Sequence, residues 1–596
     1  MGISPRLWFF LGLIFVLVLA ACGPSSAPTA TPAPVSTRPP TPTLSPDAPP
    51  TPTPFYGNIG SIEWLEKKFP FPPPPPKGEP RNGGTVHLVA AAWSSLDPTK
   101  AAAAWVHANV YQTLFEQKLG WDYPELQYKP EYVNQLAETW EQKDPTTYIF
   151  NIRKGVKWHN VPPLNGRELV AEDVKYAFEK QMAGGYQAVK VTDIDKIEVL
   201  DKYTLKVTLK QPFAGFVQRI GDPVQPWVFP KEVSEAGKLQ DDVIGTGAYV
   251  LKEIKRGEAW LLERNPEYWE KDEKGRKLPY MDTVRGFVIP DTATQMAAFR
   301  TKQIDVTALN DVTQVQDILK TNPDTFVYRV PSATWGNVSL HYRLNKAPYN
   351  DVRVRRAISL AINREKMKKV LYDDDADLYP PIPWVWTYPE WPRQYDKLGP
   401  WYKYDVAKAR QLLAEAGFPN GFKAKMTFAA ATGRPAWEDA AQVLKEQLKD
   451  VGIDVELAPV ESTVITKLRA DGNWDDILLT SVTVAGPGYD DMVYWTHHSK
   501  GPPIQNPDRL NDPKLDEMLD KQRRMDPNDP EFKKMTLQIF DYLKDQVYRT
   551  TTTVYFRYEI QHPYAQNFAS APYNWFYGYG YYYVKRAWLG DGAPKR

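Results

Sequence analysis

The first 82 residues of this chain cannot build a hydrophobic core, so folding is confined to the residues that follow. Residues 1–6 form a short positive leader, and residues 7–21 form an unbroken apolar run. That run is short for a bilayer span, which needs about 20 residues, but it suits the core of a signal peptide. Residues 23–54 carry proline at almost every second or third position, which favours extended polyproline II. We therefore predict a signal peptide at 1–21, a semi-rigid tether at 22–82 and a folded body from Gly83.

Cys22, the only cysteine, directly follows the apolar run. The segment Leu19-Ala20-Ala21-Cys22 resembles a bacterial lipobox, in which a signal peptidase cuts before the cysteine and acyl chains are attached to it. This resemblance implies a lipoprotein that is anchored through Cys22 on the outer face of the bacterial cytoplasmic membrane. An uncleaved signal anchor is the alternative. Since no second cysteine exists, we expect no disulfide.

Length and charge limit the classes of protein to consider. A chain of 596 residues exceeds one hydrophobic core, so two or three packed lobes are expected. Its net charge of +1, without a long basic run, argues against nucleic acid as a partner, because binding phosphates requires a clustered cationic face. Aromatic residues make up 13% of the chain, with 20 Trp and 34 Tyr, and this richness bears on the choice of ligand below.

Hydrophobic periodicity indicates that strands and helices alternate. Val174, Ala177 and Phe178 share one face of a predicted helix, and Asp351 is a plausible N-cap of another, with Gly452 closing a third. The alternation predicts an α/β or mixed α+β fold. The predicted strands are 85–90, 147–152, 203–210, 283–290 and 453–460, and the predicted helices are 171–182, 351–372 and 439–452.

The sequence shows no pattern typical of a catalytic or metal site. Of seven histidines, His497 and His498 are the only close pair, and adjacent side chains do not converge on one ion, so we predict solvated surface histidines. Cys22 is consumed by lipidation, and no Gly-x-Ser-x-Gly elbow occurs. We predict no cofactor, no metal and no enzyme activity.

Six blocks of sequence, in order, resemble the family 5 solute-binding proteins of ABC transporters, the oligopeptide, dipeptide and nickel class. The first is "LAETWEQKDPTTYIFNIRKGVKWHNVPPLNGRELVAEDVKYAFEK" (136–180), and the second is "GTGAYVLKEIKRGEAWLLERNPEYW" (245–269), with Ala248 where proline is usual. The other four blocks are "NKAPYNDVRVRRAISLAINRE" (345–365), "YDVAKARQLLAEAGFPNGF" (404–422), "LKEQLKDVGIDVEL" (444–457) and "NDPKLDEMLDKQRRMDPNDPEFKKMTLQIFDYLKDQ" (511–546).

This resemblance implies a two-lobed periplasmic-binding-protein-like fold of type II, with an extra domain, that closes by a hinge. It also implies a monomeric receptor of an ABC importer that captures an oligopeptide or oligosaccharide between the lobes and delivers it to a membrane permease. A membrane-tethered glycan-active hydrolase and an adhesive glycan-binding lipoprotein are the alternatives. The implied parts are a first lobe (83–116, 240–333 and 561–596), an extra domain (117–239) and a second lobe (334–560).

The same resemblance points to residues that contact the ligand. In peptide-binding relatives an acid within the block that matches 480–497 receives the amino terminus, but here Gly486 stands at that position and Asp490 lies downstream. The absence of the acid puts recognition of a free amine in doubt, although a shifted Asp490 could still serve. The other implied contacts are Thr480, Thr483 and Tyr489 from this block, and Ala103 and Trp105 from a first-lobe loop.

The segment "PPIPWVWTYPEW" (380–391) corresponds to a family loop that overhangs the ligand cavity. Trp384, Trp386 and Tyr388 are spaced by two, so an extended backbone would place their rings on one side, about 6.5–7 Å apart. Such rings either stack on the flat face of a sugar or an aromatic peptide side chain, or they fill the space between the lobes. Together with the missing acid, the aromatic richness slightly favours a neutral oligosaccharide.

Overall fold

The computed structural model describes residues 76–90, 93, 95–100, 103–117, 132–185, 188–221, 226–331, 337–388, 394–430, 437–482, 488–568 and 584–596. These residues belong to one compact unit, Gly57–Arg596. The predicted signal peptide, Cys22 and nearly all of the tether lie outside the described residues. Within the described residues, every helix is too short or too polar to cross a bilayer.

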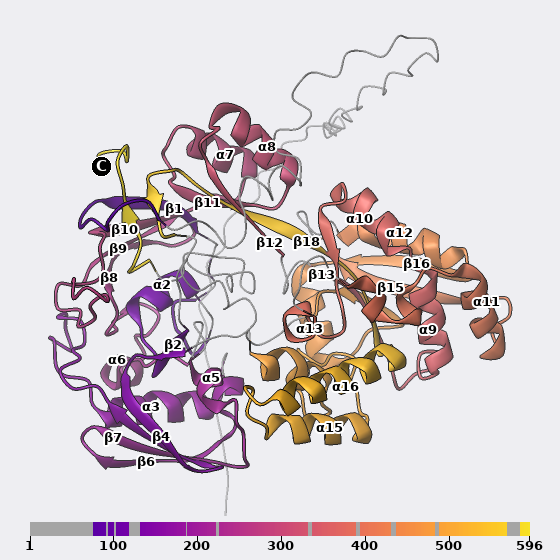
Figure 1. Ribbon diagram of the computed structural model, residues 1–596, viewed down its shortest axis with the longest axis horizontal. Helices are drawn as coiled ribbons and strands as arrows, with labels where there is room; N and C mark the ends of the chain where they lie inside the picture. The colour runs from indigo at the N-terminus through magenta and orange to yellow at the C-terminus, as the bar shows by residue number, and fades with distance from the viewer. Residues whose placement is uncertain are drawn as a thin grey trace, which may run out of the picture. The chain divides into compact units, whose positions relative to one another are not determined.

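The 13-residue strand β18 (Arg549–Gln561) belongs to both lobes. Its residues 549–555 pair antiparallel with β13 (Asn337–Tyr342) and β14 (Ala376–Leu378) of the second lobe. Its residues 556–561 pair antiparallel with β11 (Val306–Leu309) and β12 (Phe326–Pro331) of the first lobe. One sheet therefore continues from lobe to lobe through this strand (Figure 1).

The first lobe carries the strand order β11-β1-β10-β9-β8, in which β1 and β10 are parallel and β10 and β9 antiparallel. Helices α7 and α8 lie beside β11 and β12 (Figure 1). The elements of this lobe are β1 (Thr85–Ala90), α2 (Ala104–Val110), β2 (Phe115–Gln117), β8 (Tyr249–Lys255), β9 (Ala259–Arg264), β10 (Thr283–Val288), α7 (Thr292–Arg300), α8 (Val312–Thr321), β19 (Ala565–Gln566) and β20 (Trp588–Leu589).

The extra domain is a four-stranded antiparallel sheet, in the order β4-β5-β7-β6, covered by α3. Asp173 holds the start of α3, because its carboxylate accepts a hydrogen bond from the Val170 amide and pairs with the Arg167 guanidinium at 2.7 Å. The elements are β3 (Tyr132–Asn134), β4 (Ala137–Asp144), β5 (Thr147–Ile152), α3 (Ala171–Met182), α4 (Ala188–Val191), β6 (Ile194–Asp201), β7 (Thr204–Leu209), α5 (Phe216–Ile220) and α6 (Lys231–Glu235).

The second lobe has the strand order β16-β15-β17-β13-β18, with helices α9 to α12 packed around it and the helical pair α15 and α16 adjoining (Figure 1). Its elements are α9 (Val352–Ala361), α10 (Arg364–Tyr372), η2 (Trp384–Trp386), η3 (Tyr395–Leu398), η4 (Pro400–Tyr402), α11 (Val406–Glu415), β15 (Phe422–Ala429), α12 (Trp437–Lys449), β16 (Ile453–Val460), α13 (Ser462–Asp471), β17 (Ile477–Thr480), η5 (Asp490–Tyr494), α14 (Trp495–His497), α15 (Pro513–Arg523) and α16 (Pro530–Gln546).

The buried apolar side chains of this unit form several separate clusters of unequal extent. One continuous cluster joins first-lobe side chains such as Leu88 and Val284 to extra-domain side chains such as Phe150 and Val207. The second lobe has separate clusters, and among the described residues none of their fully buried members comes from the extra domain. A further cluster belongs to the first lobe alone, around α7, α8, β11 and β12. Apolar burial thus joins the rest of the first lobe to the extra domain, and leaves the second lobe with its own cores.

The sequence placed several elements correctly. The strands at 85–90, 147–152 and 453–460 and the helix at 171–182 have the predicted bounds, and β7 and β10 lie within their predicted ranges. Val174, Ala177 and Phe178 are fully buried on α3, which confirms the predicted face. Helix α12 runs from Trp437 to Lys449, so it begins and ends earlier than predicted, and Gly452 follows in a left-handed turn with φ of +86°.

The single helix predicted over 351–372 is wrong. Asp351 caps α9 as expected, by accepting a hydrogen bond from the Arg353 amide at 2.8 Å, but α9 ends at Ala361. Asn363 then caps a second helix, α10, by accepting a hydrogen bond from the Lys366 amide at 2.9 Å. A side chain that can bond its own backbone competes with the continuing helix, and this divides the apolar periodicity into two segments.

The prediction of solvated histidines is also wrong. Six of the seven side chains are buried, among them His497 and His498. Burial lowers the pKa of His107 to about 4 and that of His497 to about 3, so both rings are neutral at pH 7. His107 donates from Nε2 to the Leu96 carbonyl at 2.8 Å, which satisfies a ring nitrogen inside the core. These histidines serve packing and hydrogen bonding.

Gly286 offers a test of the packing of the first-lobe sheet. It lies directly opposite Trp260 in the β9–β10 pair, and a Cβ at this position would come within 2.2 Å of the indole ring. We expect Gly286→Ala to lower the free energy of unfolding by about 1–3 kcal/mol in a denaturant titration, because the indole has no space to retreat. Gly590→Ala is the control, since its Cβ would meet nothing closer than 3.6 Å. Equal stability of the two variants would contradict this account.

Candidate functional site

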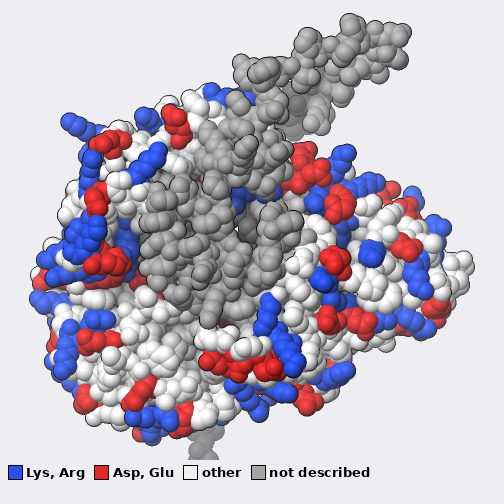
Figure 2. Space-filling model, in the orientation of Figure 1, with Lys and Arg blue, Asp and Glu red and all other residues white. Residues whose placement is uncertain are grey.

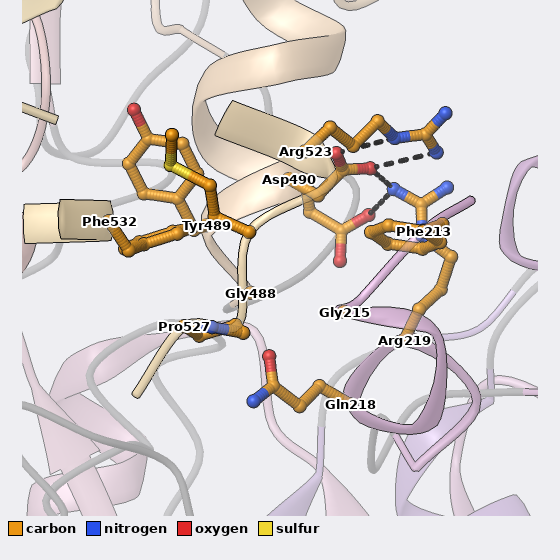
Figure 3. A pocket seen from close by; sticks show the side chains of 12 residues that line it. Phe213, Gly215, Gln218, Arg219, Gly488, Tyr489, Asp490, Arg523, Pro527 and Phe532 are labelled. Atoms are coloured by element: carbon orange, nitrogen blue, oxygen red, sulfur yellow. Dashed lines mark hydrogen bonds and ion pairs between the residues drawn. The ribbon is translucent and has the colours of Figure 1, made fainter. Parts of the chain in front are cut away.

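Six charged side chains form a cluster where the extra domain meets the second lobe. Three cations and three acids take part, so the cluster as a whole is neutral. Figure 3 shows the guanidinium groups of Arg219, from the extra domain, and Arg523, from the second lobe, both directed at Asp490. The six-charge cluster consists of Lys190, Asp193 and Arg219 from the extra domain and Asp490, Asp491 and Arg523 from the second lobe.

Most of the close ion pairs of the six-charge cluster cross between the two parts. Lys190 Nζ lies 2.9 Å from Asp491 Oδ2, and Arg523 Nη2 lies 2.8 Å from Asp193 Oδ2. Arg219 Nη2 donates to Asp490 Oδ2, and within the second lobe Arg523 Nε donates to Asp490 Oδ1 at 2.9 Å. Within the extra domain, Arg219 Nη1 lies 3.3 Å from Asp193. The Asp490 carboxylate is thus held by two guanidinium groups.

Burial controls the electrostatics of the cluster. Lys190 is fully buried, and Arg219, Arg523 and Asp491 are nearly so. Burial raises the pKa of Asp490 above its ordinary value, opposed by Arg219 and Arg523. Burial would lower the pKa of Arg523, but the carboxylates of Asp490 and Asp193 outweigh it, so this pKa stands above its ordinary value. Each charge is therefore tolerated only because its partners are present.

Aromatic rings enclose the guanidinium groups. The Phe213 ring of the extra domain lies 4.3 Å from the Arg523 guanidinium, and the Tyr494 ring lies 4.4 Å from it. The Trp495 ring of the second lobe lies 5.1 Å from the Arg219 guanidinium, so each part supplies an aromatic face to a cation of the other. Beside the cluster is a small cavity with about 30 Å³ of space that water can enter.

Asp490 begins η5, a π-helical segment that runs to Tyr494. In a π-helix the hydrogen bonds span five residues, and such segments are rare and frequent at functional sites. Here the wider turn places Asp490 and Asp491, adjacent in sequence, against Arg219 and Lys190. This segment therefore aims two acids at one face of the extra domain.

The extended backbone predicted for Trp384, Trp386 and Tyr388 is wrong. Residues Trp384–Trp386 form a 3₁₀ turn, in which the Trp386 amide donates to the Pro383 carbonyl and the Thr387 amide to the Trp384 carbonyl, both at 3.0 Å. Spacing by two therefore does not place the three rings on one side. Proline before the turn fixes φ at its own position only, and Trp384 is free to enter a tight turn.

Each ring of this segment packs within the second lobe. Trp384 is buried and donates from Nε1 to the Leu378 carbonyl at 3.0 Å. Tyr388 lies edge-on to Phe540 with ring centroids 6.1 Å apart. Trp386 donates from Nε1 to Met492 Sδ at 3.3 Å and lies edge-on to Tyr489 at 5.4 Å. The structure thus brings Trp386, Tyr489 and Asp490 together, and their role toward a ligand stays a prediction.

The other predicted contacts lie elsewhere. Ala103 precedes α2, and Trp105 lies inside this helix instead of in a loop, with its side chain buried in the core of the first lobe. Thr480 is the last residue of β17 and is buried. Thr483 and Gly486 lie outside the described residues. As predicted contacts, these five residues also remain untested.

Sequence reasoning missed most of the six-charge cluster. Arg219 follows Phe216 by three positions on α5, and Arg523 follows Leu519 by four on α15, so each cation extends an apolar stripe. A charged residue on a buried face requires a partner of opposite charge. The placement of these two cations was therefore the feature of the sequence that could have indicated the cluster. The partners come from residues nearly 300 positions away, and only the fold identifies them.

Surface charge and metal-ligating side chains add little to this description of the candidate site. Figure 2 shows basic and acidic side chains interspersed over the described part of one face, as the net charge of +1 suggests. Within the ranges that the structure describes, His, Cys, Asp and Glu side chains form no group of three or more that could hold a metal ion.

The chain matches "Bacterial extracellular solute-binding proteins, family 5 Middle" over residues 131–503, more than half of its length. The glutathione-binding protein GsiB of Pectobacterium atrosepticum is 27% identical over 383 residues, which are 63% of this chain and 69% of that protein.

Two solved structures show the same fold. DppA of Helicobacter pylori, in complex with the peptide STSA, has a TM-score of 0.70 and 23% identity, and covers 86% of this chain and 99% of its own. AppA of Bacillus subtilis, in complex with a nonapeptide, has a TM-score of 0.68 and 21% identity, and covers 86% of this chain and 100% of its own. The predicted two-lobed periplasmic-binding-protein-like fold is confirmed. These relatives are binding proteins, so the prediction that the chain is not an enzyme is confirmed as well.

Substitution of Trp384 tests whether the segment that carries Trp384, Trp386 and Tyr388 belongs to the core of the second lobe. Trp384→Phe removes the indole donor and leaves the buried Leu378 carbonyl unpaired. We expect the free energy of unfolding to fall by about 1–3 kcal/mol in the absence of any ligand. Trp140→Phe is the matched control, because Trp140 is 40% exposed on β4, and its effect should stay within about 0.5 kcal/mol. An unchanged stability of Trp384→Phe would show that the indole contributes nothing to the core.

Proposed function

Because this chain belongs to the bacterial extracellular solute-binding proteins of family 5, we propose that it captures a peptide or a related small ligand between its two lobes and delivers it to the permease of an ABC importer. The observation that carries the proposal is the division of the described residues into two bodies. The first lobe and the extra domain share one apolar core, the second lobe has its own, and β18 connects them. A hinge between two rigid bodies permits closure on a ligand.

Two observations favour a peptide-like ligand over an oligosaccharide. The tryptophans that suggested a sugar platform, Trp384 and Trp386, pack within the second lobe. The relatives reported above are named for glutathione or are in complex with the peptide STSA or a nonapeptide. An oligosaccharide stays the second candidate, on the aromatic content of the chain alone.

Asp490 bears on how such a peptide is held. Both of its oxygens already accept hydrogen bonds from Arg219 or Arg523. An ammonium group of a ligand would have to compete with two guanidinium groups that are buried and paired, and displacing either one leaves an uncompensated charge. We therefore propose that Asp490 does not receive the amino terminus of the ligand, and that backbone pairing carries more of the affinity.

The proposed location is the outer face of the cytoplasmic membrane. The support comes from the sequence: an apolar run that ends at Cys22, followed by a proline-rich tether. Acyl chains on Cys22 would hold the chain at the bilayer, and the tether would let the folded body reach a permease there.

A ligand screen tests the proposed function. We expect short peptides at a hundred times their dissociation constant to stabilise the folded chain by about 2.7 kcal/mol, seen as a rise in melting temperature. Native mass spectrometry of the purified chain identifies a ligand that is carried through purification. Each peptide is paired with its N-acetylated form, and because Asp490 is engaged, we expect the two affinities to agree within about threefold, or about 0.65 kcal/mol.

The outcomes of the screen differ. If only oligosaccharides raise the melting temperature, the peptide assignment is wrong. If acetylation abolishes binding, an acidic residue does receive the amine and the account of Asp490 fails. If no tested peptide or oligosaccharide raises the melting temperature, the receptor proposal itself fails.

Cys22 tests the anchor. In cells that process bacterial lipoproteins, we expect Cys22→Ser to move the exported chain from the membrane fraction to the soluble fraction, because the acylated side chain is lost. Ser25→Ala, three residues further along the tether, is the control and should stay in the membrane fraction. Membrane retention of Cys22→Ser would show that another segment, such as an uncleaved signal anchor, holds the chain.

A further inference from the structure

We propose that the six-charge cluster is a closure latch: a reversible electrostatic contact that holds the extra domain against the second lobe in the closed form. This inference rests on the proposed function, since it assumes that these two parts separate and rejoin. The latch would set how much of the chain is closed.

The extra domain contacts the first lobe and the second lobe through surfaces of different composition. The extra domain is joined to the first lobe by a continuous apolar core, which suits a permanent contact. Against the second lobe it presents charges instead, with Val189 packing against the second-lobe core beside them. Buried ion pairs add little net stability, because desolvation offsets their attraction, and a contact made from them can open at small cost.

The two halves of the six-charge cluster carry opposite net charges. The extra-domain half, Lys190, Asp193 and Arg219, carries two cations and one acid, for a net charge of +1. The second-lobe half, Asp490, Asp491 and Arg523, carries two acids and one cation, for a net charge of −1. The two halves therefore attract each other as they approach, an attraction that salt screens over a Debye length of about 10 Å at 0.1 M.

Each half also retains partners when the contact opens. Arg219 keeps Asp193 at 3.3 Å within the extra domain, and Arg523 keeps Asp490 at 2.9 Å within the second lobe. Asp491 separates from both Lys190, at 2.9 Å, and Arg219, at 3.5 Å. Both guanidinium groups therefore keep a carboxylate partner when the contact opens, which suits a reversible latch.

The neighbouring packing fits a contact that forms and separates. The Ala214 amide donates to the Arg523 carbonyl at 3.3 Å, a long backbone bond across the interface. The cavity of about 30 Å³ beside Asp490 is lined in part by Gly215 and Gln218 of the extra domain and by Pro527 of the second lobe (Figure 3). Water can enter here first when the charges separate.

Distance measurements without any ligand test the latch. In a full-length chain with Cys22→Ser, fluorophores are attached at Leu200→Cys on β6 and Glu517→Cys on α15, both exposed positions. We expect Lys190→Gln to lower the ratio of closed to open molecules by about tenfold or more, since it removes a cation whose partner, Asp491, lies on the other side. The matched control is Lys196→Gln, which breaks the exposed Lys196–Glu198 pair within the extra domain and should leave the ratio unchanged.

Lys190→Arg makes the test independent of folding losses, because it keeps a cation opposite Asp491 and should keep the closed population. Raising NaCl from 0.1 to 1 M should open the unaltered chain. The latch is overturned if folded Lys190→Gln matches the Lys196→Gln control. Should Lys190→Gln fail to fold, salt decides: opening of the unaltered chain between 0.1 and 1 M NaCl supports the latch, and an unchanged distance overturns it. The labels report distance without ligand, so failure of the ligand screen does not affect this result.

Discussion

The hydrogen bonding of β18 constrains the rest of the structure, because one strand completes the sheets of both lobes. Up to Tyr555 its backbone pairs with β13 and β14, and from Phe556 it pairs with β11 and β12. The four threonines at 550–553 are buried, and β-branched side chains favour an extended chain. A change in the angle between the lobes has to be absorbed where the partners of this strand change, since on either side its backbone groups are committed to one lobe.

Given that joint, the distribution of apolar surface determines which parts move together. The core that runs from Val284 in the first lobe to Val207 in the extra domain makes these two a single body. The second lobe buries its own side chains around β13 and β15. Among the described residues, the contact between the extra domain and the second lobe is one where Arg219 and Arg523 are buried. A charged interface at this place is expected if the contact has to open, and unexpected if it were permanent.

Local patterns in the sequence predicted the local structure, and failed where a distant contact decides. The strand at 147–152 and the helix at 171–182 follow from period alone, and the ordered blocks of the family gave the two-lobed fold. The helix over 351–372 failed because Asn363 bonds its own backbone, and the spacing of Trp384 and Trp386 failed because a 3₁₀ turn replaces the strand. Arg219 could have been flagged by its apolar neighbours, but its partner Asp490 is 271 residues away and no local pattern contains it.

Asp490 lies between the predicted ligand contacts Trp386 and Tyr489 of the second lobe and its contact with the extra domain. Tyr489 lies edge-on to Trp386 and Phe532, and the next residue, Asp490, already belongs to the six-charge cluster. Tyr489 and Asp490 lie at the start of η5. Because they share one backbone turn, a shift of one of them moves the other. Asp490, which lies downstream of the position where the resemblance expects an amine-binding acid, pairs instead with Arg219 and Arg523, so under the proposed latch this segment would serve closure. The free energy of closing the two bodies would then add to that from ligand contacts, and the ligand would need fewer charged contacts of its own to be retained.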